Sequence, residues 1–297
     1  MLQLDHERNG SRACLRFAVD LDYDVSGPSE FWLNVHAAVT PHQWVLAESF
    51  ATLPMVPVTV DTDPVSGNRI AAFRFESGRL SCRYGARVLV EHFIAEPDSL
   101  SSSTPSQLPL ATMQYLHPSR FCQADLLTQR AWKEFGSMPR GYANIAAIRD
   151  WVERNIHFRP GISLPTTTAL DTLNDGAGVC RDFAHVMISF CRALNYPARF
   201  VTGIDYGADP AFGPPDFHAY VEVYIGDRWF LFDPTGISPV TGLLRIGTGR
   251  DAADASFATI FGPVRTGIPR VSISAENDPE GAFTTPMPTE LAVSTAA

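Results

Sequence analysis

A segment rich in serine and proline divides the chain into two parts with different hydrophobic patterns. It contains the run SLSSSTPSQLP, directly after residue 98. Serine and proline at this density do not build a packed core, so the segment is typical of a linker. We therefore predict four regions: a β-rich N-terminal domain over 1–97, a linker over 98–110, a core of helices and strands over 111–274, and a disordered tail over 275–297.

Short strands are the predicted structure of the N-terminal part. Apolar and polar side chains alternate from Ala13 to Asp20, as expected for a strand with one buried face. Turn-forming residues, such as those at 26–28 and 66–68, separate this run from others like it. Several short strands at this spacing favour a β-sandwich. The further runs lie at 30–39, 43–51, 55–60, 69–75 and 86–95.

A helical period appears after the linker, which makes the whole chain an α+β protein. Ile145, Ile148 and Val152 recur at the spacing of one helix face. Another helix is expected to begin near Cys180 and to end before Pro197. The other predicted helices lie at 123–136 and 142–156, and the predicted strands lie at 198–205, 217–225, 228–233 and 270–274.

The charge balance and the cysteines limit the classes of function. The chain has 23 Lys and Arg against 32 Asp and Glu, a net charge of -9, which disfavours binding to nucleic acid or to anionic membranes. No apolar run reaches the roughly 18 residues of a membrane span, and the first residues do not resemble a secretory signal. The five cysteines include no CxxC pair and their odd number fits no complete disulfide framework. We therefore expect free thiols and a cytoplasmic location.

One cysteine lies where the backbone favours a nucleophile. Gly176 and Gly178 precede Cys180, which begins a predicted helix. Glycine permits a sharp turn and the close approach of a ligand. Free N–H groups at a helix N-terminus favour a thiolate over a thiol and can hold an oxyanion. A buried small residue at a helix start is the alternative interpretation of this segment.

A predicted hairpin further along the chain brings a histidine and an aspartate together. Its two alternating strands flank Gly226 and Asp227, which suit a two-residue turn. With that turn, Tyr220 pairs with Asp233, so His218 becomes the diagonal neighbour of Asp233 on the same face. Diagonal Cβ atoms lie roughly 7 Å apart or less, within reach of a hydrogen bond. Such a pair is what a thiol nucleophile needs, because the imidazole takes the thiol proton and the carboxylate orients the ring.

Four segments around these residues resemble the transglutaminase-like superfamily, in its bacterial branch of predicted cysteine proteases. The resemblance covers roughly residues 115–265 and implies a papain-like fold, in which a helix bearing the cysteine packs on an antiparallel sheet bearing histidine and aspartate. By position it implies Cys180 as the nucleophile, His218 as the base and Asp233 as the orienting partner, with no cofactor and no metal. The segments are GVCRDFA at 178–184, PARFVTG at 197–203, DFHAYVEV at 216–223 and WFLFDPT at 229–235.

Three further residues are candidates for the surroundings of the site. Asn174 and the backbone N–H of Cys180 are the nearby candidates for holding an oxyanion. Asp182 is expected to cap the helix or to pair with an arginine, with a substrate contact as the alternative. Trp229 lies on the same face as Asp233 and is expected to shield the His–Asp pair from water. The remaining cysteines are expected to serve packing: Cys14, Cys82, Cys122 and Cys191.

The leading hypothesis is an enzyme that attacks a peptide, a protein amide or a peptide-like small molecule through an acyl-thioester. Hydrolysis is favoured over amine transfer, because nothing in the sequence selects an amine and because animal transglutaminases have an aromatic residue where this chain has Arg181. Protein-glutamine acyl transfer and a non-catalytic binding scaffold are the alternatives. A zinc site is a further alternative, but the spacing of its candidate ligands matches no zinc motif. Those ligands would be Cys180, His185, His218 and Asp233.

Overall fold

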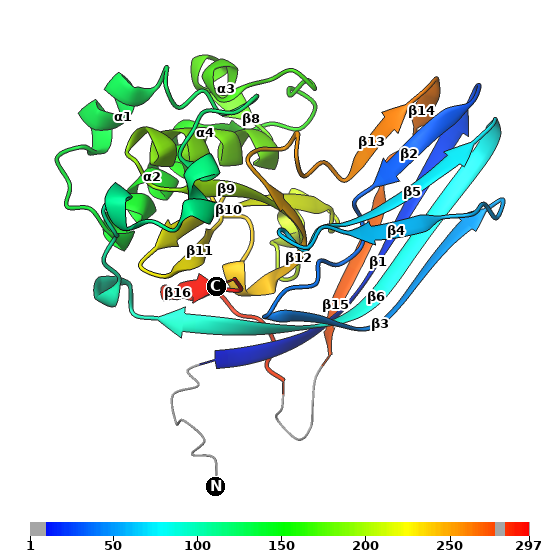
Figure 1. The fold of residues 1–297 in the computed structure, drawn as a ribbon, viewed down its shortest axis with the longest axis horizontal. Helices are drawn as coiled ribbons and strands as arrows, with labels where there is room; N and C mark the ends of the chain where they lie inside the picture. The colour runs from blue at the N-terminus through cyan, green and yellow to red at the C-terminus, as the bar shows by residue number, and fades with distance from the viewer. Residues whose placement is uncertain (1–9, 277–282, 297) are drawn as a thin grey trace, which may run out of the picture.

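Two sheets form the β-rich lobe of the protein (Figure 1). The computed structural model describes residues 10–276 and 283–296. In it, β1 (Gly10–Val25) and β6 (Gly78–Ala95) pair along their length and bury alternate side chains against the smaller sheet. The larger sheet also contains β3 (Gln43–Leu53), β14 (Val264–Thr266), β15 (Arg270–Glu276) and β16 (Ala292–Ser294). The smaller sheet has the order β13 (Ala258–Phe261), β2 (Ser29–Leu33), β5 (Arg69–Phe75) and β4 (Thr59–Thr62).

The β lobe takes in strands from beyond the expected N-terminal domain. β13 pairs with β2, and both β14 and β15 pair with β1. These three strands follow the helical part in sequence and begin within the expected core, 111–274, so the strand pairing joins that core to the expected N-terminal domain, 1–97. The physical reason is that β1 and β2 would otherwise expose unpaired backbone groups at a sheet edge. A two-layered β structure was predicted, but its last strands come from the C-terminal part of the chain.

The C-terminal segment is an ordered part of the fold, whereas its composition predicted disorder. In the described range 283–296, β16 pairs with the end of β6, and Ala292 and Val293 are fully buried. Arg245 donates a hydrogen bond to Thr295 Oγ1 at 2.8 Å. Burial of small apolar side chains therefore outweighs the disorder that Thr, Pro and Glu suggest. The rest of the expected tail, 277–282 and 297, lies outside the described residues.

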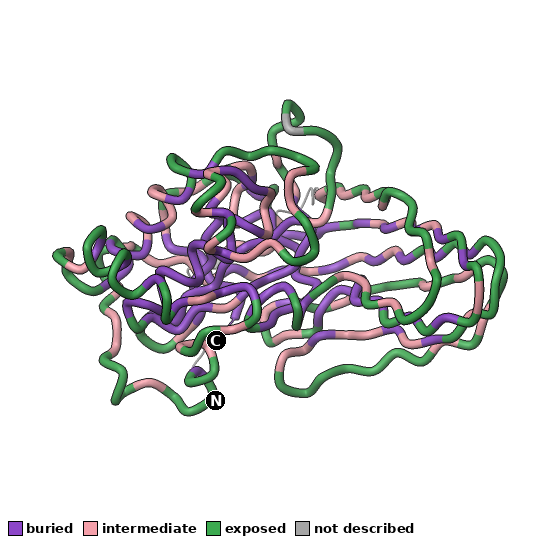
Figure 2. Tube along the Cα trace, turned by 90° about the horizontal axis from the view of Figure 1, so that it is seen from above, coloured by how far each residue is buried: buried purple, intermediate pink, exposed green. Residues whose placement is uncertain are grey.

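The second lobe is an antiparallel sheet with helices packed on it, as the α+β prediction required. The apolar stripe of α4 (Cys180–Ala193) packs on β9 and β10, and Figure 2 shows buried residues running through the centre of both lobes. Across the described ranges, no helix is both long and apolar enough to cross a membrane. The sheet has the order β11 (Arg228–Phe232), β10 (Phe217–Ile225), β9 (Ala198–Asp205) and β12 (Leu243–Gly249). The other helices are α1 (Thr128–Phe135), α2 (Tyr142–Asn155) and α3 (Ala169–Asp175).

Two buried side-chain amides tie the lobes together. Gln43 of β3 donates from Nε2 to the Arg245 carbonyl at 2.8 Å and accepts from the Arg245 N–H at 2.8 Å. Asn68 makes the same pair of bonds with Thr248, at 2.7 and 2.8 Å. Both partners belong to β12, so each amide extends the hydrogen bonding of the core sheet into the β lobe.

Candidate active site

Local backbone geometry places Cys180 at the first position of α4. The preceding helix α3 ends at Gly176, whose φ of 62° lies in the left-handed region that favours glycine. The short strand β8 (Ala177–Gly178) then pairs in parallel with β7 (His157–Phe158), and Val179 is extended at the N-cap. The chain therefore enters the helix from a fixed strand. Cys180 is partly exposed there, beside backbone N–H groups that have no helical acceptor.

Asp182 holds this turn in place. Its carboxylate is fully buried and accepts a hydrogen bond from the Val179 N–H at 2.9 Å and from Ser163 Oγ at 3.0 Å. Arg181 pairs with the same carboxylate at 3.3 Å. A Cβ at Gly178 would lie 2.7 Å from the Asp182 Cβ, so this close approach requires glycine. Asp182 therefore makes both a cap contact and an arginine pair, while its alternative role as a substrate contact stays a prediction.

Replacing Asp182 with alanine should destabilise the protein more than the matched change at another helix start. The variant removes the buried carboxylate that accepts from the Val179 N–H and from Ser163 and that pairs with Arg181, so we expect a loss of about 2–4 kcal/mol in the free energy of unfolding. Asp171 makes the equivalent cap in α3 but is exposed, and Asp171→Ala should cost about 0.5–1 kcal/mol. Urea denaturation of both variants measures the difference. Equal losses would show that burial of Asp182 does not matter.

The hairpin carrying the histidine and the aspartate has the predicted register. Ile225 pairs with Arg228 across the turn and Val221 pairs with Phe232. His218 and Asp233 are thus diagonal neighbours, and their Nε2 and Oδ1 atoms lie 3.2 Å apart. A carboxylate can only accept, so Nε2 carries the proton in this bond. That leaves Nδ1 as the nitrogen that can exchange a proton with a thiol.

Asp233 is held by donors that the sequence analysis missed. Thr235 donates to its Oδ1 from the backbone N–H at 2.9 Å and from Oγ1 at 2.7 Å. The Ser238 N–H donates to Oδ2 at 3.0 Å. With these bonds the carboxylate cannot rotate away from His218. The signal was present in the sequence, since an Asp-Pro-Thr turn offers the hydroxyl and the N–H two residues after the aspartate.

His218 and Asp233 each stabilise the charged form of the other, which offsets the effect of burial on their pKa values. Burial alone would lower the pKa of the His218 imidazole, but interactions with Asp233 and with the Cys180 sulfur outweigh it and hold that pKa well above its usual value. Burial alone would raise the pKa of Asp233, but His218 and Thr235 lower it. The arrangement therefore favours an imidazolium between a carboxylate and a sulfur.

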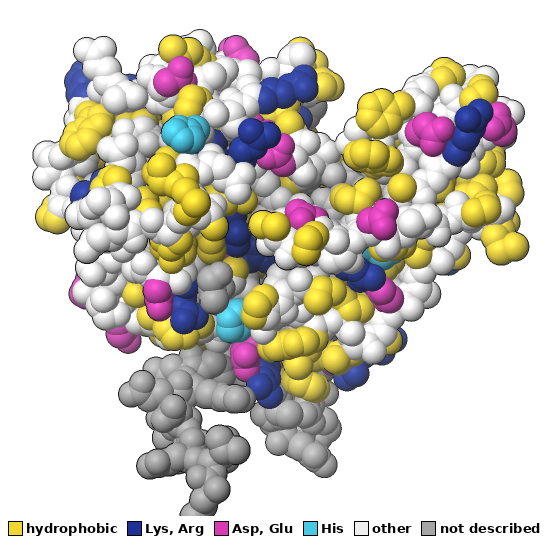
Figure 3. Space-filling model, viewed as in Figure 1, with side chains coloured by type: hydrophobic (Ala, Val, Ile, Leu, Met, Phe, Trp, Pro, Cys, Tyr) yellow, Lys and Arg dark blue, Asp and Glu magenta, His cyan; other side chains and the backbone are white. Residues whose placement is uncertain are grey.

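Cys180 and His218 open onto a cleft of about 810 Å³ between the two lobes. Cys180 and His218 lie on the side of the helical lobe, and Phe200 and Thr202 of β9 also line it. The other side is formed by the chain leading into β13, including Phe257 and Ala258. Figure 3 shows the notch that separates the lobes on one face of the molecule. A molecule bound in this cleft would meet Cys180 and His218 together.

Two of the expected surrounding residues lie elsewhere. Asn174 is exposed near the end of α3 and does not line the cleft, so it is not placed to hold an oxyanion there. Trp229 packs edge-on against Tyr115, with ring centroids 5.2 Å apart, at the far end of β11. The prediction that Trp229 shields the His–Asp pair was wrong, although Trp229 does lie on the same face of the sheet as Asp233. The ring of Tyr220 contacts the His218 ring instead, with ring centroids 4.7 Å apart.

His185 does not join the site. Its Nε2 accepts a hydrogen bond from the Ala252 N–H at 3.2 Å, and its ring stacks on Phe121 with centroids 5.1 Å apart. Complete burial lowers the pKa of this imidazole well below its usual value, so it is neutral. The set of side chains suggested for zinc therefore does not converge. Within the described part of the chain, no three His, Cys, Asp or Glu side chains are grouped to hold a metal ion.

The other four cysteines have environments opposite to that of Cys180. All four are buried, whereas Cys180 is partly exposed. Burial raises the pKa of Cys82 and of Cys122 to about 12, and it also raises the pKa of Cys14 and of Cys191. A thiol that rarely ionises is a poor nucleophile. These cysteines are packing residues, as predicted.

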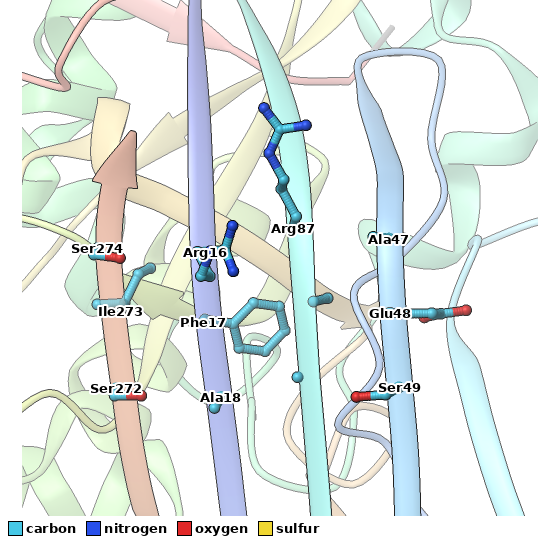
Figure 4. A pocket seen from close by; sticks show the side chains of 12 residues that line it. Arg16, Phe17, Ala18, Ala47, Glu48, Ser49, Arg87, Ser272, Ile273 and Ser274 are labelled. Carbon is cyan, nitrogen blue, oxygen red and sulfur yellow. The ribbon is translucent and has the colours of Figure 1, made fainter. Parts of the chain in front are cut away.

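A second hollow, of about 540 Å³, crosses the outer face of the larger sheet (Figure 4). Figure 4 shows it spread over β15, β1, β6 and β3, with small residues such as Ala18 along its floor. Its arginines, Arg16 and Arg87, both donate to Glu276, at 2.9 and 2.7 Å. It contains no thiol and no imidazole. The cleft at Cys180 is therefore the candidate active site.

Known proteins are similar to this chain in sequence, and a solved structure is also similar to it in fold. The family model described as the transglutaminase-like superfamily matches residues 131–234, a range that contains Cys180, His218 and Asp233. The crystal structure of a putative cysteine protease from Cytophaga hutchinsonii matches with a TM-score of 0.89 at 35% identity, over 96% of this chain and 98% of that chain. The uncharacterized protein ML0607 of Mycobacterium leprae (strain TN) is 24% identical over 200 residues, which cover 64% of this chain and 71% of that protein.

Proposed function

Because the chain belongs to the transglutaminase-like superfamily, we propose that it is a cysteine-dependent hydrolase of peptide or peptide-like amide bonds. In this proposal Cys180 is the nucleophile, His218 the general base and acid, and Asp233 the residue that orients His218. One observation carries it: the sulfur at the start of α4 interacts with an imidazole whose Nε2 is held 3.2 Å from a buried carboxylate. The similarity to a protein described as a putative cysteine protease supports the same class of enzyme.

The proposed reaction starts with transfer of the Cys180 proton to His218 Nδ1. The thiolate then attacks the carbonyl carbon of the amide, and the carbonyl oxygen becomes an oxyanion beside the first N–H groups of α4. The C–N bond breaks as His218 returns the proton to the leaving nitrogen, which leaves an acyl-thioester on Cys180. A water molecule, deprotonated by His218, attacks the thioester and releases the acid and the thiol.

Amine transfer would follow the same steps until the last, where an amine replaces water. We propose hydrolysis because water reaches a partly exposed sulfur without any dedicated site. Transfer would require a pocket that binds an amine in preference to water, because water is far more concentrated than any amine. The two outcomes differ only in the product, so product analysis with and without an added amine distinguishes them.

Selective alkylation of Cys180 tests the proposed nucleophile without a known substrate. We expect iodoacetamide to modify Cys180 at least about tenfold faster than any other cysteine of the native protein, because the others are buried and protonated. His218→Ala should slow the labelling of Cys180, since the imidazolium that stabilises the thiolate is gone. Peptide mapping by mass spectrometry measures both rates. Similar labelling of all five cysteines in the folded protein would refute the proposal.

A further inference from the structure

The strand β13 ends the smaller sheet and leaves one backbone edge open. Among residues 10–276 and 283–296 it pairs with β2 alone, and no other backbone group bonds to it. The Asn34 N–H donates to the Phe257 carbonyl at 2.8 Å, so these two residues form a hydrogen-bonded pair at the start of the β13–β2 pairing. Because hydrogen bonding alternates along an antiparallel pair, Ala258 and Ile260 direct their N–H and C=O groups away from β2.

This open edge continues directly from the candidate active site. Phe257, Ala258 and Pro269 line the cleft that contains Cys180, and the same three residues line an adjoining cavity of about 270 Å³. Ile260 also lines the adjoining cavity. A single groove therefore runs from the sulfur along β13. Its other wall includes Leu21, Tyr23, Thr266 and Gly267.

An aromatic pair lies beside the groove on the solvent side of β13. Trp32 of β2 and Phe261 of β13 are 55% and 57% exposed, and their rings meet edge-on with centroids 6.2 Å apart. Thr259, the cross-strand partner of Trp32, lines the cleft. A strand added at this edge would place every second side chain next to these rings. Apolar side chains at those positions would gain contact area there.

We propose that the open edge of β13 binds the substrate as an added β-strand, which makes the substrate an extended polypeptide segment rather than a small amide. The inference rests on the proposed function, because the groove is assigned through its continuity with Cys180. An extended chain uses its alternate amides to satisfy the backbone groups of Ala258 and Ile260. The edge of a second copy of this protein fits less well, because these groups line a concave groove and not an open face.

Peptides with blocked amides test the pairing in the unmodified protein. The probe is a tetrapeptide chloromethyl ketone, which alkylates Cys180 after its peptide portion has bound. Two derivatives carry N-methyl groups on one or the other alternate set of amides. We expect one derivative to react roughly tenfold more slowly than the parent and the other to react within about twofold of it, since only one set faces β13.

A variant of the strand tests the same contact from the protein side. Ile260→Pro removes the N–H that faces the groove and leaves the bonds to β2, because Pro is tolerated where an edge strand donates no ladder bond. We expect it to slow the peptide reagent roughly tenfold. Val60→Pro is the matched control. The Asp63 N–H donates to Asn68 at 2.9 Å, so by the same alternation the Val60 N–H points away from β5 at the far edge of the sheet.

Iodoacetamide separates failure of this inference from failure of the proposed function. It reports the nucleophile alone, because it has no peptide portion. If Cys180 reacts selectively with iodoacetamide but both N-methyl derivatives react as fast as the parent, the strand pairing is overturned and the proposed function stands. A folded Ile260→Pro variant that reacts with the peptide reagent at an unchanged rate would also overturn the strand pairing. If Ile260→Pro does not fold, as judged by circular dichroism, the rates of the two N-methyl derivatives alone test the pairing. If Cys180 is not selectively labelled, the proposed function itself fails.

Discussion

Replacing Cys180 with alanine is expected to lower amide-bond cleavage by about 10⁵-fold and to leave the fold unchanged. No other group in the proposed mechanism can form the acyl intermediate, so loss of the sulfur removes the reaction path as a whole. The side chain is small and partly exposed, so its truncation should change the free energy of unfolding by less than about 1 kcal/mol. Cleavage of a pool of fluorogenic peptides, together with urea denaturation, measures both effects.

Cys14→Ala is the matched control for this experiment. It also removes one thiol, but from a buried position in β1 of the β lobe. We expect this variant to retain the activity of the unmodified protein. Cleavage that survived in a stable Cys180→Ala variant would contradict the mechanism, because it would require another nucleophile.

Replacing His218 with alanine should be nearly as damaging, at about 10⁴- to 10⁵-fold, because both proton transfers depend on its ring. Asp233→Asn should cost less, about 10²- to 10⁴-fold, since the base remains and only its orientation and charge are lost. His157→Gln changes an exposed histidine of β7 and should have little effect. Rates of peptide cleavage for the three variants give this ranking. Equal activity in His218→Ala and His157→Gln would contradict the role of His218.

The pH dependence of Asp233→Asn gives a second and independent readout. In the unmodified protein the alkaline limb of the kcat/KM profile reports loss of the proton from the pair of His218 and Cys180. Asp233 is one of the groups that raise the pKa of His218, so its neutralisation should move the alkaline limb to lower pH. Asp205 is another buried carboxylate, bonded to Ser238 rather than to His218. Asp205→Asn should leave the limb in place, and an equal shift in both variants would contradict a specific His–Asp pair.

The parts of the site that sequence reasoning predicted depend on short-range rules. The turn at Gly226 and Asp227 fixes the pairing of β10 with β11, and the pairing fixes the position of His218 relative to Asp233. The helix start at Cys180 follows from the glycines before it and the apolar stripe after it. Both results need only a turn type or a helical period, which adjacent residues determine.

The features that were not predicted depend on longer distances. Pairing of β13 and β15 with strands near the N-terminus spans more than 200 residues, and no local pattern encodes a partner that far away. Trp229 was placed on the correct face, but it lies four residues before Asp233, which is roughly 13 Å along a strand. The helix α3 was not among the predicted helices, although Thr168 and Asp171 form a capping box at its start. Face and register follow from the sequence, whereas tertiary partners do not.

The central claim is that Cys180 carries an acyl group during catalysis, and intact-mass spectrometry tests it most directly. The protein is mixed with a peptide library, quenched with acid within one turnover, and analysed with and without an added primary amine. We predict a covalent adduct with the mass of an acyl fragment, mapped to Cys180, absent from Cys180→Ala and converted to free acid even when the amine is present. Peptide cleavage without any adduct on Cys180, or an adduct on another residue, would contradict the account.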